Sequence, residues 1–221
     1  MNRSKSIKTI ICAAALAIAM LASVPSLAVS HLTQILNPDA TYTSTTSLLA
    51  ITGSTNTPVN SITDGNLTAS FSNTQYIGAR GWASPPYTES ASPKTLYNRV
   101  SSLTITFDKA LTTFGLETES NMASVYSFDM KFYNGDTSIG SINRVDISGN
   151  AGARLLAASS DVTFNKVVLT TTAKTGFGTA QLRYKADSPA AVPEASTLIG
   201  FGSSLLMAGP GMIGWLRRRR A

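Results

Sequence analysis

Histidine and cysteine are almost absent from this chain, which has one of each in 221 residues. Cys12 lies in an N-terminal segment that we expect to be removed, so the rest of the chain has no thiol for a disulfide. A zinc site of His and Cys ligands is therefore excluded. A Ser-His-acid triad would need His31, which we expect to be a mobile residue near a new N-terminus.

Charged residues are also scarce, at 14% of the chain, and they are unevenly placed. Seven of the 18 Lys and Arg lie in the two terminal segments, with one of the 12 Asp and Glu, so 11 of each sign remain in residues 29–192. This central part is formally neutral, although the whole chain carries +6. A neutral domain without a basic run lacks the electrostatic attraction on which nucleic-acid binding depends, so no nucleic-acid partner is expected.

The first 28 residues have the pattern of a secretory signal peptide. Arg3, Lys5 and Lys8 precede an apolar stretch at residues 10–24, and Pro-Ser-Leu-Ala follows it. A basic region, a short apolar region and small residues at the cleavage site are the three parts of such a signal. We expect a signal helix in residues 1–28, cleavage after Ala28, and export of the remaining chain.

A longer uncharged stretch occupies residues 195–216 near the C-terminus. As a helix these 22 residues would extend ~33 Å, about the thickness of a bilayer core. The sequence therefore predicts a transmembrane helix that contacts the membrane through residues 195–216. Basic residues directly after such a helix tend to stay on the cytoplasmic side. Here they are Arg217, Arg218, Arg219 and Arg220.

A short motif, Val192, Pro193, Glu194 and Ala195, stands where this helix begins. Motif, apolar helix and terminal arginines together resemble the PEP-CTERM sorting signal of exported Gram-negative proteins, with Ala195 in place of the final proline. The resemblance implies recognition by an exosortase, whose own residues would process the tail, so no catalytic residue is expected here. The alternative is a plain membrane anchor, which needs only the helix and the arginines.

The same resemblance implies where the protein acts. It would cross the inner membrane, be anchored transiently in it, and then become part of the cell surface or extracellular matrix. Proteins of this class are made alongside exopolysaccharide, so association with exopolysaccharide or a biofilm matrix is the implied role. Parts of the central domain, residues 103–136 and the expected closing hairpin at residues 164–171 and 177–184, also resemble the sandwich domain of many PEP-CTERM proteins.

Between the terminal segments, apolar and polar side chains alternate, as they do in β-strands. We predict an all-β fold, a two-sheet antiparallel sandwich similar to a jelly roll. Residues 151–160 are the only candidate for a short helix, and the Thr-rich residues 41–47 are expected as an edge strand or a partly ordered lead-in. Strands are expected at residues 67–71, 100–107, 125–132, 138–147, 162–172 and 180–185. Residues expected to face the core are Leu103, Ile105, Phe107, Tyr126, Phe128, Met130, Phe132, Ala180, Leu182 and Tyr184.

The expected domain plan has five parts. A signal peptide (1–28) is followed by an N-terminal lead-in with candidate edge strands (29–61) and by the sandwich domain (62–186). A short linker (187–192) then leads to the sorting signal (193–221). Residues 78–92 within the sandwich, rich in Gly and Pro, are expected to form a long irregular loop.

Candidate catalytic and metal-binding residues are few. Glu117 and Glu119 would share one face of a strand, but a solvated strand end explains them more simply than the carboxylate pair of a glycosidase. Asn134-Gly135-Asp136, and Asp146 with Asn150, contain oxygen ligands of the kind that calcium prefers, yet turns are built from the same residue types. No metal, no cofactor and no enzymatic activity are expected, and a secreted hydrolase is the least favoured alternative.

Aromatic residues in and beside the 76–89 region offer the one candidate recognition site. Tyr76, Trp82 and Tyr87 could form a platform for stacking on sugar rings, which would make the chain a carbohydrate-binding module. The competing interpretation has Trp82 and Tyr87 fold back to cap one end of the core. The sequence leaves both open.

Overall fold

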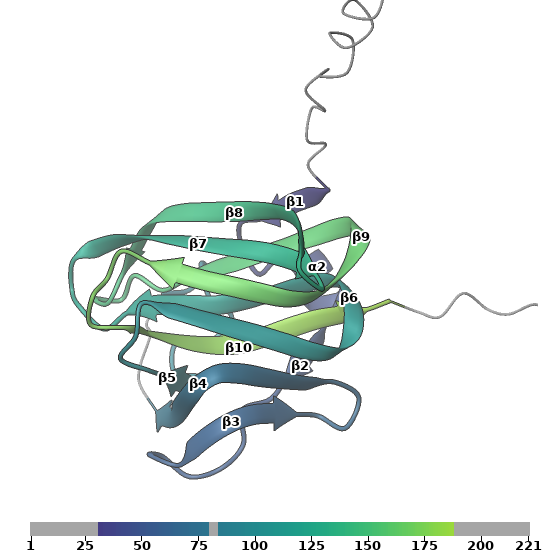
Figure 1. Ribbon diagram of the computed structural model, residues 1–221. Helices are drawn as coiled ribbons and strands as arrows, with labels where there is room; N and C mark the ends of the chain where they lie inside the picture. Colours follow the sequence, from purple (N-terminus) through teal and green to yellow (C-terminus); the bar gives the residue numbers. More distant parts are fainter. Residues whose placement is uncertain (1–30, 80–83, 188–221) are drawn as a thin grey trace, which may run out of the picture.

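The computed structural model describes residues 31–79 and 84–187, in which ten strands form one continuous hydrogen-bonded sheet and one short helix lies against it (Figure 1). The signal peptide with Ala28, the motif from Val192 to Ala195, the apolar segment, the terminal arginines and Trp82 lie outside these described residues. Among the described residues, no helix is both long and apolar enough to cross a membrane. The elements are β1 (Leu32–Ile35), α2 (Ala40–Thr45), β2 (Ser47–Leu49), β3 (Pro58–Thr63), β4 (Thr68–Ala79), β5 (Lys94–Tyr97), β6 (Ser102–Ser120), β7 (Val125–Asn134), β8 (Thr137–Ser148), β9 (Arg154–Thr171) and β10 (Phe177–Ala186).

The described part of the chain confirms the all-β prediction, and its packing is consistent with a sandwich. Three long strands, β4, β6 and β9, each belong to both layers. The first half of β6 pairs with β4 and the second half with β10, while β9 lies along its other side. Register shifts around Leu111 mark the change from one layer to the other, as bulges do where a strand bends.

The layers follow from these pairings. One contains β8, β7, the end of β9, the start of β6, the start of β4, and the end of β3, whose first residues pair with the end of β4. The other contains β1, the start of β9, the end of β6, β10, β5 and the end of β4, with β2 on the free side of β10. The outer face of this second layer is partly covered by α2 and by residues 84–93. The hollow and the polar cluster of the candidate site both lie on this layer.

The core lies between the layers and is built from the predicted apolar alternation. Phe128 of β7 meets Phe177 of β10 edge to face, with ring centroids 5.7 Å apart, so rings from the two layers pack against each other. The inward positions predicted in β6, β7 and β10 are buried, except that Tyr126 is half-buried at a bulge. Five phenylalanines are completely buried: Phe114, Phe128, Phe132, Phe164 and Phe177.

The two local predictions for residues 41–47 and 151–160 are wrong. Asp39 caps α2 by accepting a hydrogen bond from the Tyr42 N–H (2.8 Å), and the Thr45 hydroxyl donates to the Thr41 carbonyl (2.7 Å). The hydroxyl-rich sequence thus forms a short helix, because its side chains bond to nearby backbone groups. Residues 154–160 belong to β9, held between β6 and β1, so sheet pairing overrides their preference for helix.

Candidate functional site

A shallow hollow on the second layer is formed around two tyrosines from neighbouring strands. Tyr76 of β4 lies opposite Tyr97 of β5 in the antiparallel register, and their ring centroids are 5.8 Å apart with planes tilted by 33°. Tyr76 is 42% exposed. Gly78 leaves room for this arrangement, since a Cβ at this position would come within 2.6 Å of the Thr95 hydroxyl and 3.2 Å of the Tyr97 ring. The pair therefore presents aromatic surface to solvent from a rigid sheet.

Polar side chains complete the hollow, which has a volume of about 380 Å³. Asn98 is buried at its edge and is held firmly: its amide donates to Oε1 of Gln75 (3.0 Å), and its own side-chain oxygen accepts from the Val100 N–H (3.1 Å). These bonds fix the segment that follows β5 before any ligand arrives. The lining residues are Asn73, Thr74, Tyr76, Tyr97, Asn98, Arg99 and Val100.

Arg99 is the only charged residue among those lining residues. Its side chain is exposed, and none of the described residues that line the hollow is acidic. The backbone at this point is held by Asn121, whose side-chain amide donates to the Asn98 carbonyl (2.9 Å). The hollow thus combines an aromatic pair, fixed amide groups and one cation.

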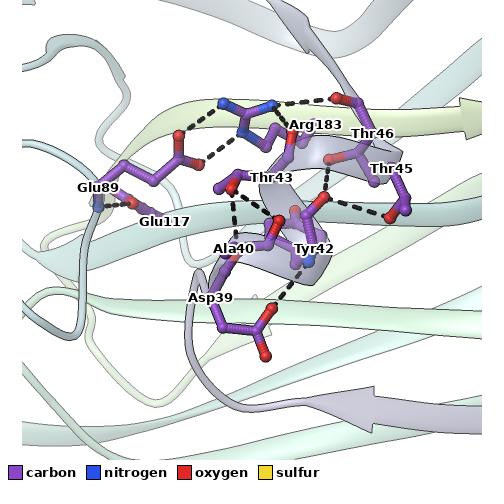
Figure 2. A network of polar contacts seen from close by, with 9 residues as sticks. All are labelled: Asp39, Ala40, Tyr42, Thr43, Thr45, Thr46, Glu89, Glu117 and Arg183. Atoms are coloured by element: carbon purple, nitrogen blue, oxygen red, sulfur yellow. Dashed lines mark hydrogen bonds and ion pairs between the residues drawn. The ribbon is translucent and has the colours of Figure 1, made fainter.

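A second cluster of polar groups lies on the same outer face, between β6, β10, α2 and residues 84–93 (Figure 2). Glu117 of β6 is completely buried, and one of its oxygens accepts a hydrogen bond from the Glu89 backbone N–H. The other oxygen, Oε2, is buried without a hydrogen-bond partner among the described residues. The expected solvated strand end is therefore wrong for Glu117, because residues 84–93 cover this face of the sheet.

Arg183 of β10 connects the remaining members of the cluster. Its Nε and Nη2 donate to the two carboxylate oxygens of Glu89, both at 2.7 Å, and its Nη1 donates to the carbonyls of Thr43 and Thr46, both at 3.1 Å. Figure 2 shows the guanidinium between the carboxylate and the end of α2. Such a bidentate pair fixes the geometry of both side chains. It ties the irregular segment and α2 to the sheet.

Burial sets the protonation of this cluster. Desolvation raises the pKa of Glu117 from its usual 4.5 to about 8; the hydrogen bond from Glu89 and the charge of Arg183 oppose the shift, while the Glu89 carboxylate adds to it. Desolvation also raises the pKa of Tyr42 above its ordinary value. The hydroxyl of Tyr42 lies over Gly115, where a Cβ would come within 2.5 Å of it. Glu117 is thus a neutral acid at pH 7, held in a dry environment.

The structure separates the aromatic residues that the sequence grouped together. Tyr76 has Tyr97 as its ring partner, whereas Tyr87 lies beneath the guanidinium of Arg154, 4.2 Å from the ring centroid. In the second layer β5, β10 and β6 lie between β4, which carries Tyr76, and β9, which carries Arg154. Tyr87 is nevertheless 45% exposed. No signal in the sequence joined Tyr97 to Tyr76, because their contact depends on the β4–β5 register.

The acidic residues of the two candidate calcium turns have protein partners. Asp136 pairs with Lys166 at 2.8 Å, and Asp146 accepts hydrogen bonds from Arg144 and Arg154. Among the described residues, no group of three or more His, Cys, Asp or Glu side chains could hold a metal ion. These turns are thus occupied by ion pairs.

His31 is held in place, contrary to the expected mobile residue. Its Nδ1 lies 2.8 Å from Oδ1 of Asp161, and its carbonyl accepts from the Asp161 N–H. This double contact joins the start of the described chain to β9. Asn66, in the sequon Asn-Leu-Thr, is exposed on the turn between β3 and β4.

Comparison with known proteins places the chain in no family. No family model matches it, and neither does any curated protein. Similar solved structures include the module TmCBM61 in complex with β-1,4-galactotriose, at 7% identity and a TM-score of 0.35, covering 56% of this chain and 90% of that one. The CBM22-1 and GH10 modules of the Clostridium thermocellum endo-1,4-β-D-xylanase 10B, complexed with xylohexaose, match at 10% identity and 0.30, over 54% of this chain and 26% of theirs.

A Bacillus subtilis family 43 arabinoxylan arabinofuranohydrolase in complex with cellotetraose matches at 10% identity and a TM-score of 0.32, over 53% of this chain and 26% of that chain. The chain thus spans about a quarter of the length of each of the two larger enzymes. With scores this low, these likenesses carry no argument about the function of this chain, which has to be argued from its own residues.

Proposed function

We propose that this chain is a non-enzymatic polysaccharide-binding protein whose binding site is the hollow around Tyr76 and Tyr97. The observation that carries the proposal is the exposed ring of Tyr76 packed against the half-buried ring of Tyr97, beside amide groups that are already fixed. The apolar face of a sugar ring packs well on an aromatic ring, and its hydroxyls need hydrogen-bond donors and acceptors around it. A rigid sheet that presents both lowers the entropy cost of binding.

The location of the protein is a further part of the proposal and is supported by the sequence of its two ends. A signal-like N-terminus and the PEP-CTERM-like tail fit a protein that is exported, sorted by an exosortase and delivered to the cell surface or extracellular matrix. Binding to exopolysaccharide would then hold it in that matrix. The jelly-roll assignment belongs to the same proposal.

Among the described residues, Glu117 favours a second function, hydrolysis, because its pKa is raised as a general acid requires. Two observations favour a structural role instead. Its carboxyl is completely buried, and the neighbouring carboxylate of Glu89 is occupied by both donors of the Arg183 fork. We therefore assign to Glu117 the support of residues 84–93.

A pull-down experiment tests the binding proposal. The full-length chain, kept in mild detergent, is mixed with insoluble cellulose, xylan and galactan, and with agarose beads that carry polygalacturonate. We expect retention on at least one of these, weakened several-fold by Tyr76→Ala and unchanged by Tyr87→Ala, which removes an equally exposed tyrosine. Both variants should keep the melting temperature of the parent. Retention on none of the polymers would contradict the proposal, and loss with Tyr87→Ala alone would move the site to residues 84–93.

A further inference from the structure

We propose that the hollow selects acidic saccharides, with Arg99 pairing with a sugar carboxylate while Tyr76 and Tyr97 pack against the ring. This inference rests on the proposed function and names the class of its ligand. It starts from the charge of the lining residues that the structure describes, among which Arg99 is the one cation and the others are uncharged. A uronate residue offers both an apolar ring face and a planar carboxylate, and these match the two kinds of group that the hollow presents.

The first step is that the side chain of Arg99 forms no ion pair with another described residue. In residues 31–79 and 84–187 there are four arginines, and the other three hold carboxylates: Arg144 and Arg154 bind Asp146, and Arg183 binds Glu89. The side chain of Arg99 makes no such contact within that part of the chain. Its guanidinium is therefore free to accept a ligand.

The second step is that the backbone carrying this guanidinium is fixed. The N–H of Asn98 donates to the Phe177 carbonyl (3.2 Å), and the Asn121 amide donates to the Asn98 carbonyl. On the other side Gly176 packs closely, since a Cβ there would come within 2.6 Å of the Arg99 Cα. Only the side chain has to be ordered when a ligand binds, which limits the entropy cost.

The third step is the chemistry of the pair. A guanidinium presents parallel N–H donors that match both oxygens of a carboxylate, whereas neutral sugar hydroxyls offer no planar, charged partner. Because the hollow is shallow and open to solvent, the charge should contribute only modestly and should be weakened by salt. We expect a preference of about five-fold for the acidic form of a polymer over its neutral form, which is the size of effect that an exposed pair provides.

The test compares two polymers that differ only in charge. Polygalacturonate and its carboxyl-reduced product, a galactan, are run in affinity gel electrophoresis with the full-length chain in mild detergent at low salt. The variants are Arg99→Gln, Tyr76→Ala, and Lys131→Gln as a matched loss of one exposed cation on β7. All retain the arginines at the C-terminus, so non-specific attraction of those residues to an acidic polymer is equal in every lane.

The expected result is a preference of about five-fold for polygalacturonate in the parent and in Lys131→Gln. This preference should disappear at 0.5 M salt, because the screening length is then only ~4 Å. Arg99→Gln should lower the preference to what the C-terminal arginines alone cause and retain binding to the reduced polymer, while Tyr76→Ala should weaken binding to both. Equal binding of the two polymers by the parent, or a preference that Arg99→Gln leaves unchanged, would overturn the inference and leave polysaccharide binding itself intact. Binding of neither polymer would count against both.

Discussion

The Glu89 backbone N–H donates a hydrogen bond to Glu117, and this one contact joins an irregular surface segment to the last part of the longest strand. Glu117 is completely buried, although it lies on the outer face of its layer. The covering segment thus places a carboxyl group in a dry environment. Energetically this is costly unless the group stays neutral, and the direction of its pKa shift agrees with that requirement.

Stability should therefore depend on pH through Glu117. Its pKa is about 8 in the folded chain and near 4.5 when unfolded, so between these values the folded state binds more protons than the unfolded state. The free energy of unfolding should then fall as pH rises from about 5 to 8, by an amount of the order of several kcal/mol at most. Urea denaturation at a series of pH values measures this slope.

Glu117→Gln is the matched variant for that measurement, because glutamine keeps the oxygen that accepts from Glu89 and cannot ionise. We expect the variant to lose most of the slope above pH 5 and to be the more stable of the two proteins at pH 9. Parallel curves for the two proteins would show that another group causes the pH dependence.

Breaking the ion pair between Arg183 and Glu89 should be strongly destabilising. The two side chains are only 14% and 12% exposed, so Arg183→Gln would leave a nearly buried carboxylate without its partner. Removing one member of a buried pair typically costs about 3–5 kcal/mol. The double variant Arg183→Gln with Glu89→Gln removes both charges and should recover part of that loss. A cost below about 1 kcal/mol for the single variant would mean that water already solvates the pair.

Amide hydrogen exchange gives a second readout of the same pair. Arg183 also bonds to the carbonyls of Thr43 and Thr46, so its loss should release α2. We expect exchange in residues 42–46 of Arg183→Gln to accelerate more than exchange in β7, where the change should reflect only the lower global stability. Equal acceleration in both segments would show that Arg183 does not hold α2 locally.

Much of the fold could be predicted from the sequence because alternation is a local signal. The inward faces of β6, β7 and β10 follow from residues two apart, and so do most of the strand positions. The passage of β6 from one layer to the other could not be predicted, because it depends on bulges near Leu111 and on partners far away in the sequence. Residues 154–160 illustrate the same limit: their apolar and small residues fit a helix until β6 and β1 are placed beside them.

The candidate site shows the corresponding limit for function. Tyr76 was identified from its aromatic character, but its partner Tyr97 is 21 positions away in the chain and adjoins it only through the strand register. Arg99 had no motif to mark it. Glu117 was identified as a carboxylate, yet its burial depends on residues 84–93, whose path over the sheet has no periodic pattern. In each of these cases the surroundings of the residue depend on contacts with residues far away in the sequence.

Phe128→Ala tests the packing between the layers. The side chain is completely buried and touches Phe177 of the opposite layer, so its removal should cost about 3–5 kcal/mol. Lys131→Ala, an exposed position on the same strand, should change the free energy of unfolding by less than about 0.5 kcal/mol. Urea denaturation of both variants gives the comparison. A loss under about 1 kcal/mol for Phe128→Ala would mean that the two layers do not pack as described.

The proposed sorting predicts the mass of the mature protein. If a signal peptidase cuts after Ala28 and an exosortase processes the tail near Pro193 and Glu194, the protein released from its native envelope should lack both terminal segments. Intact-mass spectrometry reads both ends in one measurement. Replacing the four terminal arginines by glutamine should block processing and leave a longer product in the membrane fraction, because the charges that hold the tail on the cytoplasmic side are gone. A released protein that still contains Arg217 to Arg220 would contradict exosortase processing, and a full tail found only in the membrane would favour a plain anchor.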